Sequence, residues 1–332
     1  MTALVPIAPV PCAPAPYAAV ILNLGGPEGG EHVSAYIRRM LSDRSVMPLP
    51  WPVRPLVARL IAGRRAGVVA EHYRAIGGRS PIGAQTRAQA EALRAALGGS
   101  IPVRYAFRHS TPRADSVVPG MAESGVRRIV AVPAYPQAAA STSGSALRDL
   151  DRAATRSGLE VRAVPSFPEA PGYIDALAEL VFPLLTPGAH LVFSAHGLPE
   201  RAVRRGEMYV EEVERTVRAL QRRLPGGTPS SLAFQSRVGP MKWIGPELKA
   251  EVARLAGEGV RSLVVAPISF VCENLETLYE LDVELAAHAV ACGITAFARA
   301  PAPGCHPAFI REIAFLVRRA ARAAGWEVDD GD

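Results

Sequence analysis

The chain has few cysteines and no long uncharged apolar run, and each shortage excludes a class of protein. Its four cysteines, Cys12, Cys272, Cys292 and Cys305, are scattered over 332 residues without a CxxC pair. Neither a disulfide framework nor a structural zinc site is predicted, and we expect reduced thiols in the cytoplasm. No apolar run reaches the roughly 18 uncharged residues that a membrane-spanning helix needs.

Aromatic residues are also scarce, at 6% of the chain, although the formal net charge is +6 and the sequence pI is about 9.4. Proteins that bind single-stranded nucleic acid interleave stacking aromatic residues with basic ones, and this chain does not. We therefore expect no nucleic acid partner. The excess of arginine favours a carboxylated small molecule or an anionic membrane surface instead.

Short β-branched runs alternate with longer amphipathic stretches along the chain, which is the pattern of βαβ units and a parallel sheet. The predicted strands cover residues 19–24, 103–107, 129–133, 191–195, 231–234 and 263–268. Residues 1–16 precede the first of them, are rich in proline and lack a basic start, so we expect a flexible leader rather than a signal peptide.

The strands fall into two similar series. GVRRIVAVPA at Gly125 resembles GVRSLVVAPI at Gly259, and ILNLGGPE at Ile21 resembles VFSAHGLPE at Val192. We predict an α/β protein of two similar doubly wound (Rossmann-like) lobes, 17–168 and 169–325, each a parallel sheet flanked by helices. The active-site cleft is expected between them, and the last helix is expected to pack back on the first lobe.

Three carboxylates, Glu276, Glu280 and Glu284, recur at every fourth residue directly after an apolar strand. This spacing places them on one helical face, where like charges repel by a few tenths of a kcal/mol per pair. Ligands of open α/β sheets gather at the carboxyl ends of strands. The pattern therefore predicts that a cation visits this face.

His196 also follows a predicted strand, in LVFSAHGLPE, and its counterpart in the first lobe is the glycine-rich NLGGP. The turn itself does not require a histidine, which favours a functional role over that of a satisfied structural histidine. NLGGPEGG matches neither GxGxxG nor GxxxxGK[ST], so a tight turn near a flat ligand is favoured over a nucleotide loop.

Five motifs together resemble the ferrochelatase family, which inserts ferrous iron into protoporphyrin to make protohaem: SAHGLP, FQSRVGPMKWIGP, YRAIGGRSPI, AYPQAAASTSGS and NLETLYELD. The resemblance covers roughly residues 19–320. It implies protoporphyrin IX and ferrous iron as substrates and no permanently bound cofactor. The sequence carries no signal for an oligomeric state.

The resemblance assigns iron and proton handling to His196 and Glu276, without dividing the two roles. The second lobe, 169–325, is expected to carry both residues. We also expect them to face each other across the cleft, as from opposite lobes, on either side of a planar tetrapyrrole. Glu280 and Glu284 then continue a route for protons or iron, against the alternative of a solvated helix face. Asp282 is expected to be structural.

Porphyrin contacts are implied for two groups of residues. Arg65 and Ser80 match family positions that contact the carboxylates of the macrocycle, whereas positions near the ring are implied for Leu24, Leu60, Tyr73, Tyr135 and Trp243. Arg108 matches a family arginine in the pocket region and is also expected to bind the porphyrin. For Trp243 the alternative is a core tryptophan. Residues 47–65 correspond to a lip over the site whose apolar side chains dip into a membrane interface, or to a covering helix. The expected location is cytoplasmic and peripheral to the inner face of the membrane.

The chain departs from the family's pattern in three places. Asn274 stands where many members have histidine, and an amide cannot accept a pyrrole proton, which puts a secondary relay in doubt. Val68 occupies a position that is lysine in some members. Ala140 stands where cluster-binding members have a cysteine, and the remaining cysteines are too loosely spaced, so we expect no [2Fe-2S] cluster.

Leu24, rather than tyrosine, before the GxP turn and the sequence YELD favour protoporphyrin over coproporphyrin as the substrate. Three alternatives stay open: a coproporphyrin ferrochelatase, a nickel or cobalt chelatase, and a non-enzymatic porphyrin or haem carrier.

Overall fold

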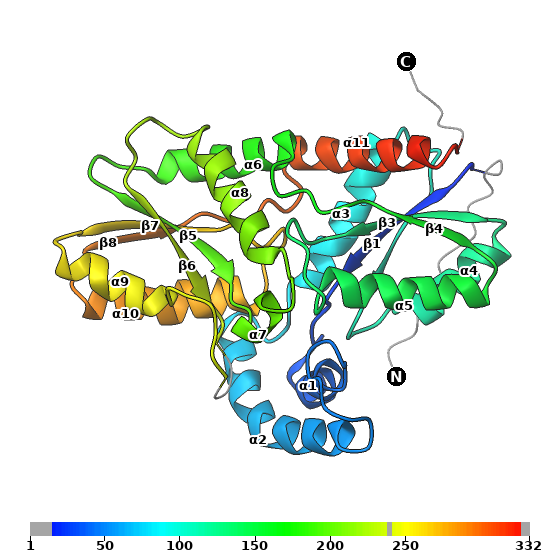
Figure 1. Ribbon diagram of the computed structural model, residues 1–332, viewed down its shortest axis with the longest axis horizontal. Helices are drawn as coiled ribbons and strands as arrows, with labels where there is room; N and C mark the ends of the chain where they lie inside the picture. Colours follow the sequence, from blue (N-terminus) through cyan, green and yellow to red (C-terminus); the bar gives the residue numbers. More distant parts are fainter. Residues whose placement is uncertain (1–14, 238–240, 327–332) are drawn as a thin grey trace.

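Two four-stranded parallel sheets form the centre of the computed structural model, which describes residues 15–237 and 241–326 (Figure 1). The predicted leader, 1–16, lies outside the described residues except for its last two. The first sheet has the order β2-β1-β3-β4 and the second the order β6-β5-β7-β8. The strands are β1 (Ala18–Asn23), β2 (Val103–Phe107), β3 (Arg128–Pro133), β4 (Glu160–Ala163), β5 (His190–His196), β6 (Ser230–Gln235), β7 (Ser262–Pro267) and β8 (Ala296–Arg299).

The shared strand order explains the internal sequence similarity. In each sheet the first strand of the series is central and is flanked by the second and third, so that GVRRIVAVPA and GVRSLVVAPI lead into the equivalent strands β3 and β7. The predicted class of two doubly wound α/β lobes is confirmed.

Two of the four edge strands, β4 and β8, were not among the predicted strands. Each has only four residues, EVRA and AFAR, and most of their side chains are partly or fully exposed. Such short edge strands carry no apolar run and no strict alternation, which are the signals by which strands are found in a sequence.

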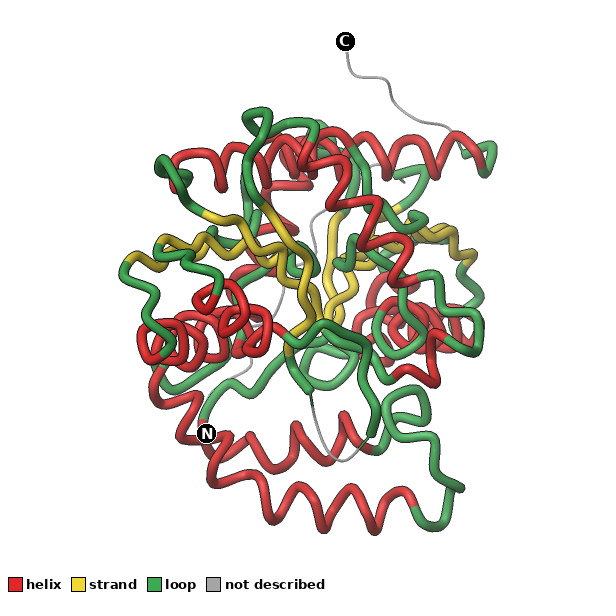
Figure 2. Tube along the Cα trace, turned by 60° about the vertical axis from the view of Figure 1, so that its left-hand side comes forward, coloured by secondary structure: helices red, strands yellow, loops and turns green. Residues whose placement is uncertain are grey.

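Helices cover both faces of each sheet, while α1 and α2 project from the body at one end (Figures 1 and 2). The α-helices are α1 (Val33–Leu41), α2 (Arg54–Ala75), α3 (Ile82–Ala96), α4 (Ala114–Glu123), α5 (Ser143–Arg156), α6 (Pro171–Val181), α7 (Glu200–Val203), α8 (Tyr209–Gln221), α9 (Leu248–Gly257), α10 (Ala286–Ala291) and α11 (Pro307–Ala323). A π-helix, η3 (Glu276–Leu285), precedes α10, and η1 (Gly30–His32) and η2 (Phe182–Leu184) are short 3₁₀ turns.

One hydrophobic core joins the two sheets. It includes Tyr173 and Phe193 from the second half of the chain and Leu93 from the first, all fully buried. The helix α11 packs on both α6 and α3, so the end of the chain contacts both halves (Figure 1). Gln89 on α3 donates hydrogen bonds of 2.9 Å to the carbonyl oxygens of Val271 and Gly304. The loop that leads into η3 is therefore fixed from the first lobe.

In the described parts of the chain, no helix combines the length and the apolar character that crossing a membrane requires.

Candidate active site

His196 is the last residue of β5, and its side chain lies against Glu276, the first residue of η3. Its Nδ1 is 2.7 Å from Oε2 of Glu276. Tyr209 donates a 2.9 Å hydrogen bond to the His196 carbonyl oxygen, and the ring of Phe270 contacts the imidazole edge-on. The side chains of His196 and Glu276 keep 33% and 27% of their surface exposed. The pair is held on one side and open on the other.

The prediction that His196 and Glu276 come from opposite lobes and face each other across the cleft is wrong. Both follow strands of the second sheet, β5 and β7, which are hydrogen-bonded neighbours. Because parallel strands end at the same edge, the two side chains meet directly. The two side chains are hydrogen-bonded to each other and would contact a ligand from the same side, rather than from opposite sides.

The two groups stabilise each other's charged forms. Burial by itself disfavours the imidazolium, but the attraction and hydrogen bond of Glu276 outweigh it, so the pKa of His196 is raised. For Glu276 burial likewise opposes ionisation, and His196 and Ser236 together hold the pKa of its carboxyl below the ordinary value. The imidazole is thus a stronger base than a free histidine.

The carboxylates after His196 lie on a π-helix rather than on the regular helix that the spacing suggested. Ser236 contacts two of them, at 3.2 Å from Glu276 Oε2 and 2.5 Å from Glu280 Oε2. It does so from a strained backbone with φ of 65°, a conformation that non-glycine residues adopt mostly where function or packing demands it. Segments of π-helix are frequent at functional sites.

Two of the three carboxylates in the predicted row, Glu276 and Glu284, are paired with basic side chains from neighbouring elements. Lys249 on α9 lies 3.2 Å from Glu284 Oε2, as His196 lies against Glu276. Asp282 points to another side and pairs with Arg299 at 2.6 Å. Glu280 differs, because among the described residues its hydrogen-bond partners, Ser236 and Gln235, are both uncharged.

Glu280 is consequently hard to ionise. Burial, followed by repulsion from Glu276, raises the pKa of Glu280 to about 7. Near neutral pH its carboxyl therefore exchanges a proton readily, beside a base and close to a second carboxylate.

We expect Glu280→Gln to stabilise the fold at alkaline pH. A carboxyl whose folded pKa is raised from 4.5 to about 7 costs stability as the pH rises through that interval, and the cost persists above it. After discounting for solvent, the gain at pH 8 is about 1–2 kcal/mol, and at pH 5 it is much smaller. Urea unfolding at both pH values measures it. Glu284→Gln is the matched control, because Glu284 has Lys249 as a partner and its removal brings no gain.

Asn274 orients the start of the π-helix. Its side-chain oxygen accepts a 2.7 Å hydrogen bond from the Glu276 N–H, and its backbone N–H donates to Thr277 Oγ1 at 3.0 Å. An amide oxygen is a good acceptor for the free N–H groups at a helix start. Asn274, which stands where many family members have histidine, thus positions the backbone of Glu276.

Three tyrosines lie near Glu276, and only one of them, Tyr73, was predicted from the sequence. The charge of Glu276 contributes, after burial, to raising the pKa values of Tyr36, Tyr73 and Tyr209. Tyr73 ends α2 and its hydroxyl is hydrogen-bonded with Ser80, so two predicted contact residues lie together. Tyr36, Tyr209 and Phe270 were not singled out in the sequence, and Ser236 was only part of the motif FQSRVGPMKWIGP. Their positions around Glu276 and His196 become clear only in the structure.

Two further predicted contacts have buried polar atoms without a partner among the described residues, the Tyr135 hydroxyl and Trp243 Nε1. Trp243 forms a bridge with Pro199 and packs against Gly197, where an added Cβ would be 3.4 Å from the indole. It therefore lies beside the turn that carries His196. Most buried polar groups in proteins are hydrogen-bonded. These two donors are therefore available to a water molecule or a ligand.

The remaining predicted contacts are spread over a wider area. Leu24 follows β1 and is half-buried, whereas Leu60 and Arg65 are exposed on α2. In the described part of the chain Arg65 has no carboxylate partner, so its charge is available to an anionic group. Leu60 is 54% exposed.

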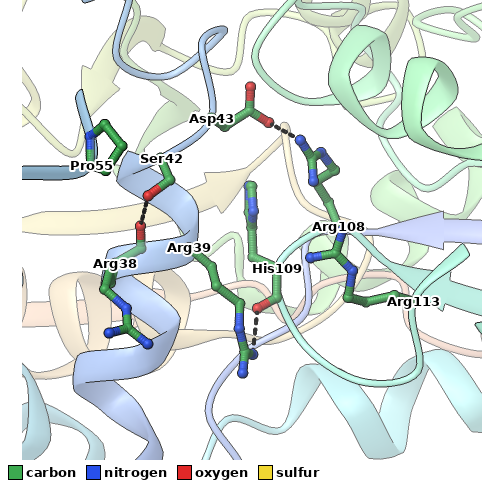
Figure 3. A pocket seen from close by; sticks show the side chains of 8 residues that line it. All are labelled: Arg38, Arg39, Ser42, Asp43, Pro55, Arg108, His109 and Arg113. Atoms are coloured by element: carbon green, nitrogen blue, oxygen red, sulfur yellow. Dashed lines mark hydrogen bonds and ion pairs between the residues drawn. The ribbon is translucent and has the colours of Figure 1, made fainter. Parts of the chain in front are cut away.

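Arg108 is already engaged by protein groups. Its guanidinium is 2.9 Å from Asp43 Oδ2 and donates a 2.8 Å hydrogen bond to Ser145 Oγ. It lines a cavity of about 420 Å³ beside α1, in which basic side chains predominate (Figure 3). The lining residues are Arg38, Arg39, Ser42, Asp43, Pro55, Arg108, His109 and Arg113.

The described residues hold no group of three or more His, Cys, Asp or Glu side chains placed to bind one metal ion. His196 and Glu276 offer one nitrogen and one carboxylate, ligand types that suit ferrous iron.

Comparison with known proteins identifies the family. A ferrochelatase family model matches residues 17–321. A ferrochelatase of Nostoc sp. is 38% identical over 314 residues, covering 90% of this chain and 80% of its own length. A ferrochelatase of Geotalea daltonii is 37% identical over 309 residues, covering 91% of this chain and 97% of its own length.

Among solved structures, SirB from Bacillus subtilis with Fe³⁺ has a TM-score of 0.54 at 15% identity, covering 94% of this chain and all of the other. That likeness concerns the fold alone. By the matching family model and the identity to its relatives, the chain belongs to the ferrochelatase family, which inserts a metal ion into a porphyrin.

Proposed function

We propose that this protein inserts ferrous iron into protoporphyrin IX to give protohaem, the terminal step of haem biosynthesis, in the cytoplasm. The observation that carries the proposal is the 2.7 Å contact between His196 Nδ1 and Glu276 Oε2 at the open edge of the second sheet. It joins a strengthened base to a carboxylate that can receive a cation. Both functions are needed where a metal replaces protons.

The insertion exchanges two pyrrole protons for one Fe²⁺. With Nδ1 occupied by Glu276, His196 presents Nε2 to the ring and accepts a pyrrole proton, while Glu276 stabilises the imidazolium that forms. Such a base contributes about 10²–10⁴-fold. Glu280, with a pKa of about 7, passes protons or iron between this pair and Glu284.

The porphyrin is proposed to lie against Leu24, Leu60, Tyr73, Tyr135 and Trp243, with Arg65 and Ser80 at its propionates. A charge-assisted hydrogen bond to a carboxylate contributes about 1.5–3 kcal/mol. The exposed guanidinium of Arg65 and the two unpaired buried donors, of Tyr135 and Trp243, support this placement. Arg108 acts indirectly, since Asp43 already binds it.

Steady-state insertion under anaerobic conditions tests the reaction and the substrate together. Purified protein is given ferrous iron with either protoporphyrin IX or coproporphyrin, and kcat/KM is compared. We expect protoporphyrin to be preferred. A tenfold preference for coproporphyrin would refute the choice of substrate, and porphyrin binding without insertion would favour a carrier. Faster insertion of nickel or cobalt would favour a nickel or cobalt chelatase.

We also propose that the lip contacts an anionic membrane surface. Trp51, Leu56 and Leu60 are 77%, 70% and 54% exposed, and Arg59 and Arg65 are exposed beside them. Apolar side chains with adjacent cations are typical of interfacial segments.

Trp51→Ser with Leu56→Ser should therefore lower co-sedimentation with phosphatidylserine vesicles about tenfold, since each large side chain adds about 1.5–3 kcal/mol when fully buried and less at an interface. Phe315→Ser on α11 is the matched control, because Phe315 is equally apolar and 56% exposed but far from the lip. Equal losses in both variants would argue against a membrane-binding lip.

The absence of a [2Fe-2S] cluster remains a proposal, supported by the different exposures of Cys272, which is buried, and Cys305, which is exposed. Iron and sulfide analysis of anaerobically purified protein tests it, and stoichiometric amounts of both would overturn it.

A further inference from the structure

The column of ligand-type side chains that begins at Glu276 continues beyond Glu284. His288 and Cys292 extend the spacing of four residues along α10, which follows η3 without a break. Carboxylate, imidazole and thiolate groups are all ligands of divalent metals, and they become softer toward the outer end of the column.

His288 and Cys292 lie against each other at that end. Cys292 Sγ is 3.6 Å from His288 Nε2, and the same nitrogen is 2.9 Å from the carbonyl oxygen of Lys249 in the first turn of α9. In a tetrahedral site with metal–nitrogen bonds of about 2.0–2.1 Å and metal–sulfur bonds of about 2.3 Å, the two ligand atoms are about 3.6 Å apart. The side chains already have the separation that one bound ion requires.

Solvent can reach this pair, since both side chains are partly exposed. The other described cysteines differ: Cys272 is buried and donates to Gln89 Oε1 at 3.1 Å, and Cys305 lies on another part of the chain. A metal ion can replace the protons of His288 Nε2 and Cys292 Sγ once the His288 ring turns away from the Lys249 carbonyl oxygen, with water completing its shell.

Lys249 connects the pair to the inner carboxylates. Its carbonyl oxygen contacts His288, and its ammonium group lies 3.2 Å from Glu284 Oε2. A divalent cation next to His288 repels this ammonium group and competes with it for Glu284.

We propose that His288 and Cys292 form an outer binding site for a borderline divalent cation such as Fe²⁺, Co²⁺ or Zn²⁺, and that iron passes from it to Glu284, Glu280 and Glu276. The first half of this proposal stands on the side-chain geometry alone. The second half rests on the proposed function.

Cobalt titration of the purified, reduced protein tests the site itself. Co²⁺ bound to a thiolate gives a near-ultraviolet charge-transfer band, which the sulfur-free pair His196 and Glu276 cannot give. We expect the band in the parent chain and in Cys305→Ser, and its loss in Cys292→Ser and His288→Ala. Lys249→Gln should tighten binding about threefold by removing a nearby positive charge. No band at millimolar Co²⁺, or an unchanged band in Cys292→Ser, would overturn the proposal.

Insertion kinetics test the passage of iron. Cys292→Ser should raise KM for ferrous iron about threefold or more and leave KM for the porphyrin unchanged, because only metal entry is affected. An unchanged KM for iron would refute the proposed transfer of iron from His288 and Cys292 to Glu284, but it would leave the cobalt evidence for the site unaffected. A parent chain that inserts no iron would instead refute the proposed function, and the titration would still decide the site.

Discussion

His196→Ala is expected to lower the rate of ferrous iron insertion by about 10²–10⁴-fold while porphyrin binding is retained. The substitution removes the proposed base and one of the two proposed iron ligands, yet leaves in place Tyr135 and Trp243, which are proposed to contact the porphyrin. Anaerobic stopped-flow insertion measures the rate, and quenching of tryptophan fluorescence measures porphyrin binding.

The matched control for this substitution is His190→Ala. His190 is at the opposite end of the same strand, β5, where its Nε2 is 3.1 Å from Ser231 Oγ. Removing it should affect stability slightly and insertion not at all. A His196→Ala protein that inserts iron at the parent rate would exclude the imidazole from the chemistry.

Glu276→Gln is expected to slow insertion by about 10²-fold or more and to shift its pH dependence. Glu276 is what raises the pKa of His196 against the opposing effect of burial. Without the carboxylate the burial effect remains, so the pKa of His196 falls and the imidazole becomes a weaker base. The ionisation of His196 in the pH–rate profile should therefore move to lower pH.

Glu258→Gln controls for the loss of one negative charge, since Glu258 is exposed and pairs with Arg254 away from the site. Its profile should match that of the parent. If the Glu276→Gln profile also matched the parent, the carboxylate would have no part in setting the basicity of His196.

The sequence predicted the fold because the chain repeats itself. The central strands β1 and β5 and their neighbours β3 and β7 are mostly apolar and are buried along nearly all of their length, and their order recurs in both halves. The short edge strands β4 and β8 escaped prediction because exposed strands need no apolar residues. Buried strands could therefore be predicted from their apolar residues, whereas the short exposed strands could not.

The arrangement of the candidate site could not be predicted from the sequence. His196 and Glu276 are separated along the chain by β6, yet β5 pairs with both β6 and β7, and only that crossover brings the two side chains into contact. A spacing of four residues also could not distinguish the π-helix from an α-helix, because both keep such residues on one side. The cap made by Asn274 and the strained Ser236 depend on backbone geometry that no pattern encodes.

The interdependence of His196 and Glu276 is tested most directly by a double-mutant cycle on the insertion rate. Because Nδ1 and Oε2 are bonded at 2.7 Å, the doubly substituted protein, His196→Ala with Glu276→Gln, should be no slower than the slower single variant. Rate losses that simply multiply would show that the two side chains act independently, and would contradict the assignment of one coupled base and iron ligand.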